Sequence, residues 1–194
     1  MIQTFSINNN EAPIIKGNTG YSLVFLLTFN NKNLLSFIES PKSENSTFLV
    51  DVAFIERNPD IIEVLRKKNR SVGLLGQHST LYEDDTSLIK EELNIFLESF
   101  DTLPLWFTTK DFLFTPSLLK ELFNNGVNAI GPTFTLLDST NINNIEKGSF
   151  IYIPIDSSNI YYKKEIDLLT SNKNYIPIED NIFNINIQSK DSPS

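Results

Sequence analysis

The chain of 194 residues contains no cysteine and one histidine, His78. The absence of cysteine excludes disulfide bonds, thiolate nucleophiles and cysteine-ligated metal sites, but it does not distinguish an oxidising from a reducing compartment. A lone histidine also excludes a metal centre that needs two imidazole ligands from this chain. The sequence is therefore poor in the residues that most often carry metal chemistry.

Basic residues are scarce and long apolar runs are missing. Sixteen lysines and arginines stand against 24 acidic residues, which gives a formal charge of −8. Such a chain repels phosphate backbones, so nucleic acid is not an expected partner. The longest apolar stretch, residues 23–27, is too short to cross a bilayer. The first twenty residues lack a basic segment followed by an apolar run, so we expect no intact secretory signal, either because the protein is cytoplasmic or because a leader was removed.

The sequence instead alternates short apolar runs with helical patterns. Residues 21–29 are almost continuously apolar, which is typical of a strand buried on both faces. We expect further strands of this kind at 47–52, 71–75, 105–108, 127–130 and 150–155. Strands that alternate with helices predict a single α/β domain with a mostly parallel sheet.

The expected helices carry recognisable start and stop signals. One is expected from Asn58 as the cap and Pro59 as the first residue, and another runs from a cap at Thr115 to a left-handed stop at Gly126. A helix over 85–100 is capped by Asp85 or Thr86, and a weaker helix covers 162–169. We divide the chain into an N-terminal segment (1–20), the domain (21–188) and a tail expected to be disordered (189–194), with residues 181–187 alternating like an edge strand.

Short motifs along residues 20–178 follow the order found in a known family. Thr28-Phe29-Asn30-Asn31 stands where the NodB-homology domain of polysaccharide deacetylases has T-F-D-D. Residues 46–50 (STFLV) resemble the family's A-T-F-F-V strand, and residues 58–60 (NPD) resemble its K-N-P-E segment. Residues 71–79 (SVGLLGQHS) take the place of its E-I-G-N-H-x-x-x-H segment. Later in the chain, residues 105–109 (LWFTT) take the place of F-R-P-P, and residues 148–151 (GSFI) take the place of G-S-I-I. The resemblance implies a distorted (β/α) barrel of fewer than eight strands.

The same resemblance implies a chemistry whose residues are replaced in this chain. The family uses one aspartate as the general base, a second aspartate and two histidines as metal ligands, and a late histidine as the general acid. These positions fall, in that order, on Asn30, Asn31, Leu75 with Ser79, and Pro154, while the arginine of F-R-P-P falls on Phe107. A neutral amide is a poor base and a weak zinc ligand, so we expect no catalytic residues and no bound metal at these degenerate positions.

Several polar and aromatic residues remain open to two interpretations. His78 could ligate a divalent metal with Glu83, Asp84 or Asp85, or it could simply be solvated; the three acids could hold calcium, or favour the start of the next helix. Asn30 and Asn31 could hydrogen-bond a sugar or be relics at a strand end. The last pair, Trp106 and Phe107, could stack on a sugar ring or belong to the core.

Three functional hypotheses follow. The first is a deacetylase-like protein without metal-dependent activity, kept as a carbohydrate-binding or protein-interaction module, with a cell-envelope glycan or a protein as its partner; the resemblance then favours an envelope or extracellular location. The second is a divergent carbohydrate hydrolase that is metal-independent or has a rebuilt divalent metal site and uses Asp51, Asp111 or Asp156. The third is an unrelated α/β fold.

Overall fold

The computed structural model describes residues 12–83, 85–136, 145–155, 163–171 and 175–183. Seven parallel strands form one curled sheet, an incomplete barrel in the order β5-β4-β3-β2-β1-β7-β6. The strands are β1 (Tyr21–Leu27), β2 (Thr47–Val50), β3 (Ser71–Leu75), β4 (Trp106–Thr108), β5 (Asn128–Ala129), β6 (Phe134–Thr135) and β7 (Ser149–Ile155). The expected fold class, a single-domain distorted (β/α) barrel of mostly parallel strands, is confirmed.

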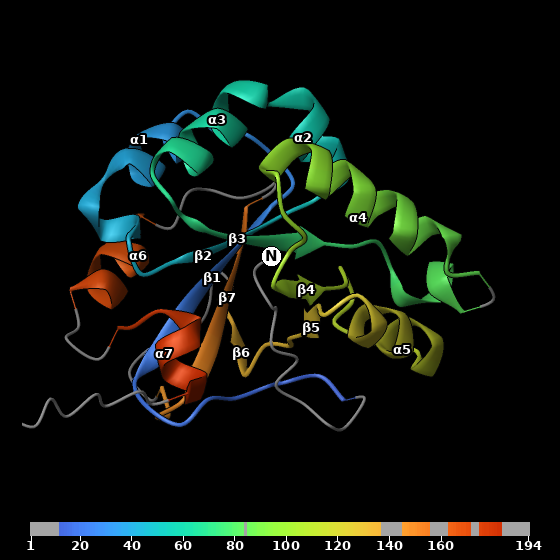
Figure 1. Cartoon of the computed structure of the whole chain (residues 1–194). Helices are drawn as coiled ribbons and strands as arrows, with labels where there is room; N and C mark the ends of the chain where they lie inside the picture. Colours follow the sequence, from blue (N-terminus) through green and yellow to red (C-terminus); the bar gives the residue numbers. More distant parts are fainter. Residues whose placement is uncertain (1–11, 84, 137–144, 156–162, 172–174, 184–194) are drawn as a thin grey trace, which may run out of the picture.

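Helices arch over the outer face of this sheet (Figure 1). They are α1 (Leu34–Glu39), α2 (Val52–Arg57), α3 (Pro59–Lys67), α4 (Ser87–Phe100), α5 (Pro116–Asn124) and α6 (Lys163–Thr170), and two short 3₁₀ turns are η1 (Pro41–Ser43) and η2 (Ser79–Tyr82). Side chains along each strand point alternately to the two faces of the sheet, which divides the core into an outer and an inner apolar cluster. In β1, Phe25 and Leu27 pack towards these helices, whereas Val24 and Leu26 belong to the smaller apolar cluster on the inner face. No helix in the described ranges is long and apolar enough to span a membrane.

A short helix, α7 (Ile178–Phe183), covers part of the inner face. Its buried Asn181 donates from Nδ2 to the Ser22 hydroxyl at 3.1 Å and to the Gly148 carbonyl at 3.3 Å. Gly148 has a φ of 89° and its carbonyl accepts from the Gly17 amide at 2.8 Å, a left-handed close approach that a side chain would obstruct. The expected edge strand at 181–187 is therefore wrong for residues 181–183, which are helical; residues 184–187 lie outside the described ranges.

The helix signals identified the main helices but not all of their contacts. The Thr115 side chain accepts from the Leu118 amide at 3.2 Å, and Gly126 has a φ of 71°, as expected. Asn58 occupies the cap position of α3 but makes no side-chain cap, because its Nδ2 instead donates to the Phe54 carbonyl at 3.0 Å. Helices α1 and α2 have six residues each, which is too short for a clear periodicity.

Candidate functional site

The carboxyl ends of parallel strands share one edge of the sheet, and polar residues follow four of them here. Asn30 and Asn31 follow β1, Asp51 follows β2, residues 76–79 follow β3, and Lys110 and Asp111 follow β4. The pairing of Leu27 with Val50, of Val50 with Leu74 and of Leu75 with Thr108 aligns these ends. This edge is the candidate site.

The two asparagines have different surroundings. Asn30 is exposed, and its Nδ2 donates to the Asn58 Oδ1 at 3.0 Å. Asn31 accepts through Oδ1 from the Asn33 amide at 3.0 Å, whereas its Nδ2 is buried and has no hydrogen-bond partner among the described residues. Because an unpaired buried donor is unfavourable, a rotation of the Asn31 side chain that brings Nδ2 to an acceptor oxygen at the surface would be favoured.

Asp51 and Lys110 form a largely buried ion pair next to these amides. Asp51 Oδ1 accepts from the Phe54 amide at 2.7 Å and so caps α2, while its other oxygen lies 3.0 Å from Lys110 Nζ. The Lys110 ammonium also donates to the Gln77 Oε1 at 3.0 Å. Asp51 is thus engaged twice, and Lys110 places one fixed positive charge at the carboxyl edge of the sheet.

A buried carboxylic acid lies behind this pair. Glu92 of α4 is buried, and the Tyr82 hydroxyl donates to its Oε2 at 2.6 Å. Burial raises the pKa of Glu92 to about 7, although hydrogen bonds from Tyr82 and Gln77 act in the opposite direction. Burial and the neighbouring Glu92 carboxylate raise the pKa of Tyr82 far above its usual value, so this phenol remains protonated and continues to donate.

Asp111 organises the loops that follow β3 and β4. Its oxygens accept from the Ser79 amide at 3.0 Å, the Ser79 hydroxyl at 2.8 Å and the Leu113 amide at 3.3 Å. Partial burial favours the neutral acid, but these hydrogen bonds, led by those from Ser79, outweigh it and lower the pKa of Asp111. His78 Nδ1 lies 3.7 Å from the same carboxylate and its side chain is 65% exposed.

The donor set does not fit the metal centre that the resemblance implies. Within the described ranges, no group of three or more histidine, cysteine, aspartate or glutamate side chains is placed to hold a metal ion. Leu75 is buried in the inner apolar cluster, Ser79 is bound to Asp111, and Pro154 lies in β7 opposite Leu26. Asp85 bonds the amide and hydroxyl of Ser87 at the start of α4, which agrees with its structural interpretation; Asp84 is outside the described residues.

Of the two interpretations of Trp106 and Phe107, a sugar-stacking face and the core, their burial agrees with the core. Both side chains are fully buried, Trp106 in the inner cluster and Phe107 under the helices. The Trp106 Nε1 donates to Glu179 of α7 at 2.7 Å. The pair belongs to the core, whereas Phe29, which directly precedes Asn30, is 43% exposed.

Sequence reasoning identified Asp51 and Asp111 but not Gln77, Tyr82, Glu92 or Lys110. One signal was present, because Glu92 falls on the same helical face as Ile89, Leu93 and Phe96. An acid on an apolar face indicates a buried polar contact. The involvement of Gln77 and Lys110 depends on the loops after β3 and β4 meeting in space, which no local pattern reveals. Asp156, the third acid considered, lies outside the described residues.

No protein-family model and no curated protein sequence matches the chain. Solved structures do resemble it. A family 4 carbohydrate esterase pseudoenzyme from Bacillus anthracis aligns with a TM-score of 0.70 and 16% identity, covering 84% of this chain and 65% of that one. A mutant of this pseudoenzyme with restored enzymatic activity aligns with a TM-score of 0.72 and 16% identity, covering 87% of this chain and 69% of the mutant.

Two further structures show the same likeness. The family 4 carbohydrate esterase PdaA of Bacillus subtilis has a TM-score of 0.70 at 17% identity, covering 90% of this chain and 86% of its own. The chitin deacetylase of Colletotrichum lindemuthianum has a TM-score of 0.71 at 13% identity, covering 89% and 92%. The chain therefore has the fold of the NodB-type deacetylases, which excludes the hypothesis of an unrelated α/β fold.

Proposed function

We propose that this domain is a deacetylase-like protein that lacks metal-dependent N-deacetylase activity and binds an N-acetylated glycan of the cell envelope. The ligand lies across the carboxyl ends of β1 to β4. Asn31 provides the observation on which the proposal depends, since its Nδ2 is buried without a hydrogen-bond partner among the described residues. The acetamido carbonyl or a hydroxyl of an N-acetylhexosamine supplies the missing acceptor once the Asn31 side chain turns its Nδ2 towards the surface.

The exposed residues beside Asn31 suit the same ligand. Asn30 offers a second amide, and Phe29 presents an aromatic surface on which the apolar face of a sugar ring can rest. The names of the similar structures also point to carbohydrate, since they include carbohydrate esterases and a chitin deacetylase. Fold likeness alone does not determine function, so the proposal depends on the amides.

The acid–base groups at this edge support loss of the ancestral reaction. By the resemblance, Asn30 and Asn31 stand where the family has two carboxylates, and two described carboxylates at this edge are held by the protein itself: Asp51 by Lys110 and the cap of α2, Asp111 by Ser79. A general base must be free to take a proton from water. Neither acid has that freedom in the described arrangement.

The first test measures metal content and acetate release together. Protein incubated with zinc, cobalt or manganese and then desalted is expected to hold well under one metal ion per chain, and to release no acetate from N-acetylchitohexaose above the buffer rate. Asn30→Asp with Asn31→Asp is expected to remain inactive, because Leu75 and Ser79 supply no imidazole. Stoichiometric metal together with acetate release would refute the proposed loss of activity and favour a rebuilt site at His78.

The second test measures binding by titration calorimetry with N-acetylchitohexaose and with its fully de-N-acetylated counterpart. Asn31→Ala is expected to weaken binding of the acetylated oligomer about five-fold, the effect of one uncharged hydrogen bond. Asn94→Ala, on the exposed side of α4, is the matched control and should leave affinity unchanged. If neither oligomer binds, or if both variants behave alike, the glycan assignment is wrong and a protein partner becomes the better hypothesis.

A further inference from the structure

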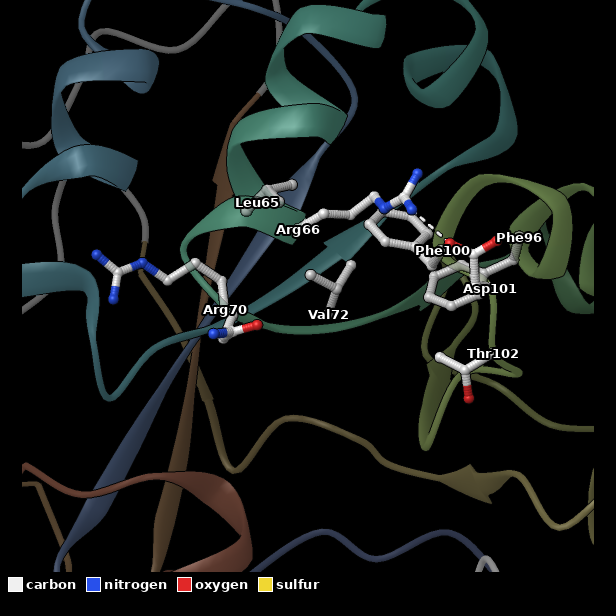
Figure 2. Close-up of a pocket in the computed structure, with 9 residues that line it drawn as sticks. Leu65, Arg66, Arg70, Val72, Phe96, Phe100, Asp101 and Thr102 are labelled. Atoms are coloured by element: carbon white, nitrogen blue, oxygen red, sulfur yellow. Dashed lines mark hydrogen bonds and ion pairs between the residues drawn. The ribbon is translucent and has the colours of Figure 1, made fainter. Parts of the chain in front are cut away.

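A pocket of about 460 Å³ lies at the opposite edge of the sheet, where β3 begins and where α3 and α4 end. Figure 2 shows its lining residues, which come from the last turns of these two helices, the connection to β3 and the residues after α4. The volume falls in the range that accommodates a small organic molecule. Its position makes it independent of the candidate site and of the function proposed above.

The floor of the pocket is apolar and partly aromatic. Leu65 and Phe96 are buried, and Val72 and Phe100 are partly buried against the outer core. The rings of Phe96 and Phe100 are stacked, with centroids 4.5 Å apart and an interplanar angle of 29°. A flat apolar group placed on this surface would add to the ring stack and lose its contact with water.

An ion pair closes one side of the pocket. Arg66, in the last turn of α3, is paired through Nη2 with the Asp101 carboxylate just after α4 (Figure 2). Their side chains are 48% and 73% exposed, so the pair contributes little stability and exchanges readily. Asp101 is the only acid among the residues that line the pocket.

The second arginine of the pocket is already engaged elsewhere. Arg70 Nε and Nη2 donate to the Ile38 carbonyl at 3.1 and 2.9 Å, and Nη2 also donates to the Ser40 carbonyl at 3.1 Å. Its guanidinium points away from the aromatic floor, so its aliphatic stem faces the pocket (Figure 2). Arg66 is therefore the cation that a ligand can reach.

The charge around the pocket is opposite to that of the whole protein. Residues 66–70 (RKKNR) hold four of the 16 basic residues of a chain whose net charge is −8. Such a concentration of positive charge attracts anions and excludes cations. An arginine at the rim also binds a carboxylate through two parallel hydrogen bonds, which a lysine cannot do.

We propose that this pocket binds a small amphipathic anion, a planar apolar ring system that carries one carboxylate. The ring lies against Phe100, which is stacked on the buried Phe96, and the carboxylate takes the place of Asp101 on the Arg66 guanidinium. The apolar floor accounts for the body of the ligand, and the exchangeable ion pair for its charge.

The test compares two probes of the same shape, 1-naphthoate and the neutral 1-naphthamide, by titration calorimetry at pH 7.5. Naphthoate is expected to bind with one site per chain, and at least ten-fold more tightly than the amide. Arg66→Gln should remove this preference. Lys67→Gln, which changes the net charge equally but alters a residue that pairs with Glu63 outside the pocket, should leave it within two-fold.

A third variant changes the affinity in the other direction. Asp101→Asn removes the competing carboxylate, and asparagine tolerates the left-handed backbone at this position, where φ is 60°. Naphthoate should then bind several-fold more tightly. Equal binding of the two probes, equal effects of Arg66→Gln and Lys67→Gln, or no naphthoate binding by any variant that keeps the wild-type melting temperature, would overturn the proposal.

Discussion

Glu92 is a carboxylic acid inside a protein whose other described acids lie mostly at the surface. Burial raises its pKa to about 7 in the folded state, whereas an unfolded chain gives it an ordinary value near 4.5. Between these two values the folded state holds a proton that the unfolded state has released. Its effect on stability therefore depends on pH in a direction that can be predicted.

Stability should fall as the pH rises from about 4.5 to about 7 and should then level off, because above pH 7 the folded protein must bury the ionised carboxylate. Glu92→Gln removes this dependence. The variant should gain roughly 3 kcal/mol relative to the wild type over that window, which chemical denaturation at several pH values would measure. Glu91→Gln, at the exposed neighbouring position, is the control. A pH profile identical for the two variants would contradict the assignment.

At the residue scale, some residues of the candidate site can be located from the sequence and others cannot. Asn30 and Asn31 could be placed at the carboxyl edge of the sheet from the sequence, because they directly follow an apolar run that is unmistakably a strand. The partners of Asp51 could not be located. Lys110 lies 59 positions away from Asp51 in the sequence. The two residues meet because β2 and β4 lie on either side of β3, so that the loops after these strands come close together.

At the scale of elements, α5 and α4 begin differently although both have a threonine at the cap position. Thr115 accepts from the Leu118 amide, whereas Thr86 makes no side-chain cap bond. Thr115→Ala should lower the free energy of unfolding by about 1 kcal/mol, and Thr86→Ala by much less. Urea denaturation of both variants would check this contrast; equal losses would show that the cap bond of α5 contributes nothing.

The elements that sequence patterns predicted share strong local signals. Helices α3 and α5 each begin with a proline, at Pro59 and Pro116, and β1 is buried along its whole length. Helix α7 carries a weaker local signal, two acidic residues in its first turn. Its six residues are too few for a clear periodicity, and its buried Asn181 accepts from the Thr19 amide and donates to Ser22 and Gly148, all of them distant in sequence. Tertiary contacts, rather than local preference, determine its conformation.

At the scale of the whole molecule, the fold persists although the sequences have diverged widely. Identities of 12–19% to the carbohydrate esterases still accompany TM-scores of 0.62–0.72. Many sequences of suitable size and polarity can fill the same core, whereas a metal site tolerates few substitutions. A chain can thus retain the sheet while the residues at its carboxyl edge change.

Strand β1, an interior strand of the sheet, has neighbours from distant parts of the chain. β1 pairs with β2, which follows it closely, and with β7, whose first residue is Ser149. A nascent chain must therefore leave one edge of this wholly buried strand unpaired until most of the polypeptide has been synthesised. We expect slow folding, in which the β1 amides gain protection from hydrogen exchange after those of α4 and α5 in a pulse-labelling experiment. During synthesis, β1 is thus the segment most in need of a chaperone.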